Sequence, residues 1–172
     1  VSHEAFSFAG HHGLGKLVVF YDQNFISIEG DTHITYTDDV KQRMEAYHWH
    51  VQEVDGHDPA AIAAAIEAAQ AETERPSVVI CNTRISFGSP NKEGSHDCHG
   101  APLGEDEVVM TKKNLGMPTE TFHVPQDVRD VFAARLEEMR QVEALWNAGF
   151  AAFAQTNPEK ALAWDQAMQG EL

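Results

Sequence analysis

The chain has 172 residues, of which 42% are hydrophobic and 23% are charged, a composition typical of one soluble globular domain with its own core. Twelve basic residues stand against 27 acidic ones, so the formal net charge is −15. This charge repels nucleic acid and anionic lipid, and we expect neither as a partner. A small anion could bind only through local donors or a metal ion. No apolar run approaches the length of a membrane span.

Two further features bear on where the protein works and how complete it is. Cys81 and Cys98 are spaced neither as a disulfide framework nor as a CxxC pair, which favours a reducing, cytoplasmic compartment. No signal-peptide pattern opens the chain. It begins at Val1, directly in helix-forming sequence and without a methionine. We therefore expect it to be a piece of a longer protein.

The first half of the chain is predicted to alternate helices and strands. The expected elements are a helix at 2–13, a strand at 16–22, a helix at 38–47, a strand at 49–55, a helix at 58–72 and a strand at 76–83. "KLVVFYD" and "PSVVICNT" are apolar, β-branched runs of the kind found in buried parallel strands. Asp58 and Pro59 are a typical N-cap and first-turn pair.

This order predicts an α/β fold, a parallel sheet with helices on both faces. Right-handed crossovers would place the ends of the strands at 16–22 and 76–83 on the same edge of the sheet. Ligands of such sheets bind beyond the carboxyl ends of the strands. The segments 22–32 and 85–104, which follow those ends, are therefore the candidate site.

The remainder is predicted to be helical. Residues 104–115 form a short helix with an acidic start, and Asn157-Pro158 caps a final helix. Between them, apolar residues recur at steps of three and four from Asp127 onward, which indicates a long amphipathic helix. We interpret its aromatic stripe, from Phe132 to Phe153, as core packing. This part is expected to be an arm that extends from the sheet domain.

"YDQNFISIEG", residues 21–30, contains candidate metal ligands at the end of a strand. The side-chain oxygen of Asn24 and a nearby main-chain carbonyl are hard oxygen donors suited to Mg²⁺ or Ca²⁺. Asx residues after strands are also common turn formers, so the residues alone leave a simple polar turn open.

"GSHDCHGAPLG", residues 94–104, contains four possible metal ligands in a row, from His96 to His99. A single HxxH without a second pair supplies at most half of a structural zinc site. Cys98 lacks the strand-turn-helix elbow of a nucleophile. The glycines and prolines instead predict a structured loop that approaches an anion closely, with an exposed flexible loop as the alternative.

Three histidines lie on the first predicted helix. His3 and Glu4 do not complete an HExxH zinc motif, because position 7 is Ser7. We interpret His3, His11 and His12 as surface or interface residues.

Six stretches together resemble transketolase, in order and over essentially the whole chain. They are "SHEAFSFAG", "LGKLVVFYDQNFISIEG", "AYHWHV", "DGHD", "FGSPNKEGSHDCHGAPLG" and "LG" at 115–116. The resemblance implies that residues 1–115 are the later part of the domain that binds the diphosphate of thiamine diphosphate. It also implies that 116–172 are a helical extension leading to a pyrimidine-binding domain outside this chain.

The resemblance assigns roles to individual residues. Asn24 matches the side-chain ligand of the divalent metal, Mg²⁺ or Ca²⁺, and Ile26 matches its backbone-carbonyl ligand. The metal neutralises the diphosphate, which reconciles anion binding with a charge of −15. His99 matches the histidine that lies near the diphosphate and the substrate oxygen, where it helps to bind and to move a proton.

Three further assignments follow from the same resemblance. Ile28 and Ile85 match positions that pack against the cofactor. Glu4 matches a glutamate of a carboxylate network at the dimer interface, where like charges raise each other's pKa.

The sequence also departs from the family pattern. Phe25 occupies a place where a small or polar residue is common, and Ser86 stands where glycine is usual in "GFGSP". The chain also contains no GDG stretch, which in the family supplies an aspartate ligand of the metal.

By this resemblance the parent protein is a cytoplasmic homodimer of the pentose phosphate pathway. It would transfer a two-carbon ketol unit from a ketose phosphate to an aldose phosphate. With one metal ligand and the second domain missing, we expect the isolated chain to be inactive and to bind cofactor weakly at best. Alternatives are a fragment of dihydroxyacetone synthase or of deoxyxylulose phosphate synthase, a non-catalytic or split-enzyme subunit that acts through a partner chain, and a zinc hydrolase built on residues 96–99.

Overall fold

The computed structural model describes residues 2–171, which divide into two compact units with the boundary between Thr119 and Glu120. In the first unit, helices α1 (Ser2–His11), α2 (Val40–Ala46), α3 (Pro59–Ala71) and α4 (Glu105–Asn114) accompany strands β1 (Val18–Gln23), β4 (His50–Asp55) and β5 (Ser77–Asn82). A small ribbon is formed by β2 (Ile26–Ser27) and β3 (Gly30–Asp31), and Thr32–Ile34 and His96–Cys98 are 3₁₀ turns.

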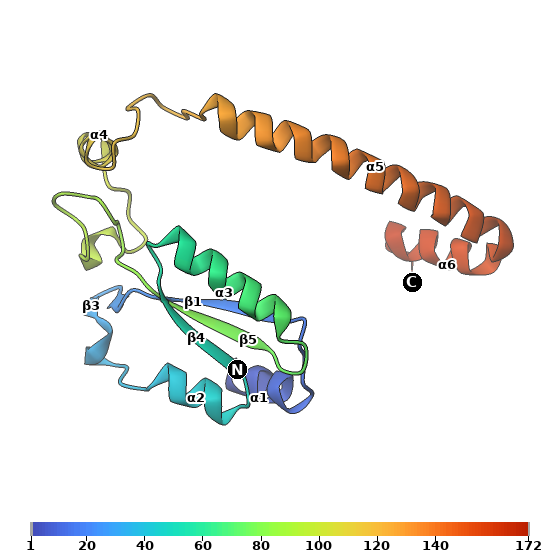
Figure 1. Ribbon diagram of the computed structural model, residues 1–172, viewed down its shortest axis with the longest axis horizontal. Coiled ribbons are helices and arrows are strands. Elements are labelled where there is room, and N and C mark those ends of the chain that lie inside the picture. Colours follow the sequence, from blue (N-terminus) through green and yellow to red (C-terminus); the bar gives the residue numbers. More distant parts are fainter. Residues whose placement is uncertain (1, 172) are drawn as a thin grey trace. The chain divides into compact units, whose positions relative to one another are not determined.

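The three long strands form a parallel sheet in the order β1-β5-β4 (Figure 1). Strand β5 is central and pairs with a strand on either side, and its residues from Ser77 to Cys81 are all buried. Burial of each such Val or Ile side chain stabilises the fold by about 1.5–3 kcal/mol. The predicted apolar strand is thus the centre of the sheet.

Alternate residues of β5 face two separate clusters. Val78 and Ile80 pack with Ala9 of α1, Met44 of α2 and Trp49 on one face of the sheet. On the other face, Val79 and Cys81 pack with Ala65 of α3. The predicted fold class, a parallel sheet with helices on both faces, is confirmed (Figure 1).

The ends of the helices show why they begin where they do. The Asp58 side chain accepts hydrogen bonds from the backbone amides of Ala60 and Ala61 at the start of α3, which confirms the predicted cap. Asp39 caps α2 in the same way, through the amide of Gln42. The β2–β3 ribbon was not predicted, because strands of two residues carry no periodic signal.

The second unit consists of α5 (Gln126–Thr156) and α6 (Pro158–Gln169). Within it, the rings of Phe150 and Trp164 lie 5.8 Å apart and join the two helices. The interpretation of the stripe from Phe132 to Phe153 as core packing is wrong for this chain: Phe132 is 71% exposed, and no residue of α5 is buried. The reason is length, because the 12 residues of α6 are too few to cover the 31 of α5.

Among residues 2–171, no helix combines the length and the hydrophobicity that a membrane span requires. Both cysteines are free and buried. His3, His11 and His12 lie at the surface, as predicted.

Candidate functional site

The two loops of the candidate site start side by side at the carboxyl ends of β1 and β5. The strands are in register to their last residues, Gln23 and Asn82, whose side chains are hydrogen bonded at 2.9 Å. One residue further, the backbone amide of Thr83 donates to the carbonyl of Gln23 at 3.2 Å, and its hydroxyl donates to Asp22. The predicted meeting of the two segments at one edge is confirmed.

The first loop is an Asx turn built on Asn24. The side-chain oxygen of Asn24 accepts the backbone N–H of Ile26 at 3.0 Å, and its amide nitrogen donates to Asp22 at 3.3 Å. Phe25, between Asn24 and Ile26, has φ +60°, and its carbonyl accepts the amide of Thr32 at 2.8 Å. The turn predicted as the simpler alternative therefore exists, and it fixes the orientation of the Asn24 side chain.

The same turn presents two oxygens on one side of the β2–β3 ribbon. Ile26 is opposite Asp31, between the bonded pair of Phe25 and Thr32 and the pair of Ser27 and Gly30. In an antiparallel ribbon such a residue directs its N–H and C=O away from the partner strand. The Ile26 carbonyl therefore points away from β3. The Ile26 N–H points the same way and donates to the side-chain oxygen of Asn24, so the two oxygens lie on the same side.

This donor set fits a hard divalent cation. An amide oxygen keeps a second lone pair after it accepts one hydrogen bond, and a backbone carbonyl is a common ligand of Mg²⁺ and Ca²⁺. No group of three or more His, Cys, Asp or Glu side chains that could hold a metal ion occurs in the part of the chain that the structure describes. The Asn24 and Ile26 oxygens are both neutral, so they leave the positive charge of such a cation to anionic ligands, among them the group that it binds.

The start of the second loop is held by His57, a residue to which the sequence analysis assigned no role. His57, after β4, accepts the backbone N–H of Arg84 at its Nε2, at 2.9 Å. Its ring stacks on Phe87, with ring centroids 3.8 Å apart. Because Nε2 is the acceptor, the neutral ring carries its proton on Nδ1. His57 lies in the stretch "DGHD", but no pattern in the sequence links it to a backbone amide 27 residues later.

The Glu93 carboxylate links residues across the first half of this loop. Glu93 accepts the backbone N–H of Gly88 at 2.8 Å and pairs with the Arg84 guanidinium at 3.0 Å. These interactions, the Gly88 amide first, lower the pKa of the Glu93 carboxyl below its usual value. The next amide, that of Gly94, donates to the carbonyl of Ile85 at 2.9 Å. The loop is therefore ordered by its own hydrogen bonds, and the alternative of a flexible loop is not supported.

The four possible ligands from His96 to His99 do not form a metal cluster. Cys98 is buried, and its thiol lies against the carbonyl oxygens of Ser95 and Lys92, at 2.9 and 3.5 Å. His99 follows the 3₁₀ turn, donates its amide to the carbonyl of His96 at 2.9 Å, and is exposed. The fold thus separates Cys98 from the solvent side and leaves the His99 ring accessible.

The other predicted site residues lie in different surroundings. Ile85 is half-buried in the second loop, whereas Ile28 is 68% exposed in the turn of the β2–β3 ribbon. Glu4 lies on α1, outside both loops, and is exposed. A backbone hydrogen bond at Glu4 itself lowers the pKa of its carboxyl, opposite to the direction expected for a carboxylate network. That network would require a second chain, so the assignment of Glu4 stays a prediction.

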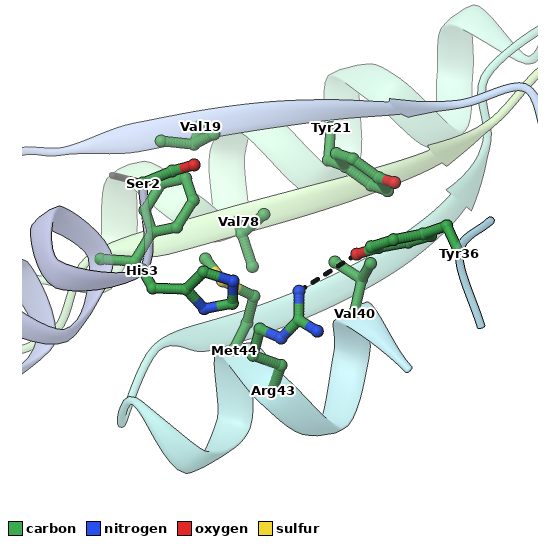
Figure 2. A pocket seen from close by; sticks show the side chains of 10 residues that line it. Ser2, His3, Val19, Tyr21, Tyr36, Val40, Arg43, Met44 and Val78 are labelled. Carbon is green, nitrogen blue, oxygen red and sulfur yellow. Dashed lines mark hydrogen bonds between the residues drawn. The ribbon is translucent and has the colours of Figure 1, made fainter. Parts of the chain in front are cut away.

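A separate cavity of about 170 Å³ lies between α1, α2 and the sheet (Figure 2). Val19, Val78 and Met44 line it, and the Arg43 guanidinium at its rim donates to the Tyr36 hydroxyl at 3.1 Å. It contains none of the predicted metal or cofactor residues.

Comparison with known proteins decides the family. The sequence profile of the family described as "Transketolase, thiamine diphosphate binding domain" matches residues 1–172. The chain belongs to this family. Transketolase 2 of Escherichia coli is 47% identical over 173 residues, and transketolase 1 of Vibrio cholerae is 50% identical over the same length. Both alignments cover 100% of this chain and 26% of the relative, so the chain spans about a quarter of their length.

Solved transketolase structures share the fold. A transketolase from Pichia stipitis, in complex with sedoheptulose 7-phosphate, is 40% identical with a TM-score of 0.82 over 99% of this chain and 26% of that one. A transketolase from Leishmania mexicana is 35% identical with the same TM-score, over 98% of this chain and 26% of its own. The recognised resemblance to transketolase is therefore confirmed.

Proposed function

We propose that this chain is part of a transketolase that transfers a two-carbon ketol unit from a ketose phosphate to an aldose phosphate. The observation that carries the proposal is the Asn24 turn. Its segment and the one that leads to His99 start side by side at the carboxyl ends of β1 and β5, which supports a shared site. The match to a thiamine diphosphate binding domain over residues 1–172 supports the cofactor.

In this proposal the turn holds a divalent metal, Mg²⁺ or Ca²⁺, through the Asn24 side-chain oxygen and the Ile26 carbonyl. Bound thiamine diphosphate supplies the carbanion chemistry, and the protein positions it. The chain has a formal charge of −15, so a diphosphate needs a cation between it and the protein. The Asn24 and Ile26 oxygens are neutral, so they do not reduce the positive charge that the metal offers to the diphosphate.

The second loop contributes a proton-transferring group and apolar contact. His99 is exposed, and an imidazole nitrogen can donate or accept a hydrogen bond, so it can bind a phosphate or sugar oxygen and move a proton. Ile85 and the exposed Ile28 offer apolar surface to the cofactor. Glu4 acts at the interface of a homodimer, and sugar phosphates in the cytoplasm are the substrates.

A segment swap tests the proposal. Residues 1–172 would replace the matching segment of Escherichia coli transketolase 2, and ketol transfer and thiamine diphosphate binding would be assayed. We expect the folded chimera to be active, and Asn24→Ala to weaken cofactor binding by about tenfold or more, since one metal ligand is lost. Asn114→Ala removes an amide of the same type that binds Gly88 instead, and serves as the matched control.

Two results would contradict the proposal. One is a folded chimera that binds no thiamine diphosphate in the presence of Mg²⁺. The other is an Asn24→Ala chimera whose cofactor affinity equals that of the control.

The isolated chain is proposed to be inactive and to bind the cofactor weakly, since it contains no GDG aspartate for the metal and spans about a quarter of the length of its relatives. Calorimetric titration with thiamine diphosphate and Mg²⁺ tests this part separately. Micromolar affinity of the isolated chain would show that its own residues complete the site.

A further inference from the structure

The loop that carries His99 is tied to a buried carboxylate on α4. Glu107 is 7% exposed and accepts three hydrogen bonds from the segment 89–91. Its Oε1 accepts the Ser89 hydroxyl and, at 2.9 Å, the Asn91 backbone N–H; its Oε2 accepts the Asn91 side-chain amide at 2.9 Å. An ionised carboxylate has acceptor sites for all three donors, and a buried charge of this kind is stable only when it is so bonded.

From this carboxylate, hydrogen bonds continue to the residues on both sides of His99. The Ser89 hydroxyl, which donates to Glu107, accepts the amide of Lys92 at 3.1 Å. The Lys92 ammonium donates at 3.1 Å to the carbonyl of Leu103, which follows His99 in the chain. The Lys92 carbonyl accepts the thiol of Cys98, the residue immediately before His99, at 3.5 Å.

We propose that Glu107 is a positioning residue for His99, acting through Ser89 and Lys92 on the two ends of the segment 98–103. Glu107 and Ser89 are buried, where a polar group without a partner would be costly, so their hydrogen bonds favour one arrangement of the segment. The loop is thereby held in one conformation before any ligand binds. The role of His99 in catalysis rests on the proposed function, whereas the effect of Glu107 on the loop concerns this chain alone.

Hydrogen exchange of the 172-residue chain tests the effect on the loop. Glu107→Ala removes all the acceptors, and we expect the amides of Gly94, Ser95 and His99 to exchange about tenfold faster or more. Glu105→Ala, in the exposed first turn of the same helix, is the matched control and should leave these rates unchanged. Glu107→Gln keeps an acceptor for Ser89 and should fall between the wild type and the alanine variant.

The amides of β5 report whether a variant has lost the whole fold instead. If β5 remains protected in Glu107→Ala while residues 94–99 exchange at the wild-type rate, the inference is overturned. If β5 also loses protection, the Glu107→Gln variant is used for the test instead. Faster exchange confined to the loop in that variant supports the inference, and unchanged exchange overturns it.

A double-mutant cycle in the chimeric enzyme tests whether Glu107 acts through His99. We expect Glu107→Ala to lower kcat/KM in the His99 enzyme, but to change it less than about twofold in a His99→Ala background. Equal losses in the two backgrounds would overturn the positioning role. A chimera without cofactor binding would refute the proposed function and leave the exchange result on the loop standing.

Discussion

Two residues of the site occupy backbone conformations that suit glycine. Phe25 and Ser86 have φ values of +60° and +55°, in the left-handed region that is costly for residues with a Cβ, above all for bulky ones. They are also the two residues that the resemblance to transketolase predicts to differ from the usual residues of the family. The departure therefore has a physical consequence, since each loop carries local strain next to a proposed functional residue.

We expect Phe25→Gly and Ser86→Gly to raise the free energy of unfolding by about 0.5–1 kcal/mol each. Relief of the left-handed strain exceeds the extra entropy of the unfolded chain, and the 51% exposed Phe25 ring loses little burial. Urea denaturation of the chain measures the difference. Glu29→Gly, at an exposed turn position without a positive φ, should lower stability, and a gain of the same size there would contradict the explanation.

Glu107 gives the loop a dependence on pH. Hydrogen bonds from the Asn91 side chain, Ser89 and the Asn91 backbone hold the pKa of its carboxyl below the usual 4.5, and the charge of Lys92 acts in the same direction. A lowered pKa means that the stabilisation is complete above the usual value and is lost as pH falls through the lowered one. The 88–104 segment should therefore loosen below about pH 4.5.

Amide chemical shifts of Ser95 and His99, followed from pH 6 to pH 3, measure this loss. Glu107→Gln removes the titrating group and should flatten that part of the titration. Glu93 also has a lowered pKa, so a smaller change that comes from Glu93 should persist in the variant. An unchanged titration in Glu107→Gln would contradict the assignment to Glu107.

At the scale of elements, α1 sits close to the segment after α2 because residue 10 has no side chain. A Cβ at Gly10 would overlap the backbone carbonyl of Tyr47, and would also approach the Trp49 ring at 3.3 Å. Trp49 belongs to the buried cluster on this face and donates its indole N–H to the Phe6 carbonyl of α1 at 2.9 Å. The helix is thus fixed by backbone contact as well as by apolar packing.

Gly10→Ala should therefore destabilise the chain by about 2 kcal/mol or more, because backbone atoms cannot yield as side chains do. Gly149→Ala is the matched control. Residue 149 lies inside α5 with no atom near its added Cβ, so the gain in helix propensity should stabilise α5 by about 0.5–1 kcal/mol. Thermal unfolding followed by circular dichroism compares the two; a neutral Gly10→Ala would contradict the close packing of α1.

An element could be predicted from the sequence when neighbouring residues alone determine it. The continuous apolar run of β5 and the Asp58-Pro59 cap each identify an element from adjacent residues, and both were predicted. The β2–β3 ribbon was missed because Ile26–Ser27 is too short for a pattern. Glu107 was missed because an acid in the first turn of a helix is common, and nothing local distinguishes one that binds the segment 89–91.

At the scale of the whole molecule, the wrong prediction was the burial of the α5 stripe. Periodicity predicted the amphipathic helix itself, but it cannot tell which surface covers the apolar face. The residues from Phe132 to Trp146 remain exposed, since α6 contacts α5 near Phe150. In the sheet unit, by contrast, the continuous apolar run of β5 already indicated that both faces of this strand are packed.

At the scale of the whole molecule we expect the metal at the Asn24 turn and not in the stretch from His96 to His99. Crystals of the chimeric transketolase with thiamine diphosphate and Mn²⁺ in place of Mg²⁺ test this directly, since the anomalous signal locates the ion. We predict one peak about 2.1 Å from the Asn24 side-chain oxygen and from the Ile26 carbonyl, a distance typical of such ligands. A peak bound by His96 or His99, with none at Asn24, would contradict the account.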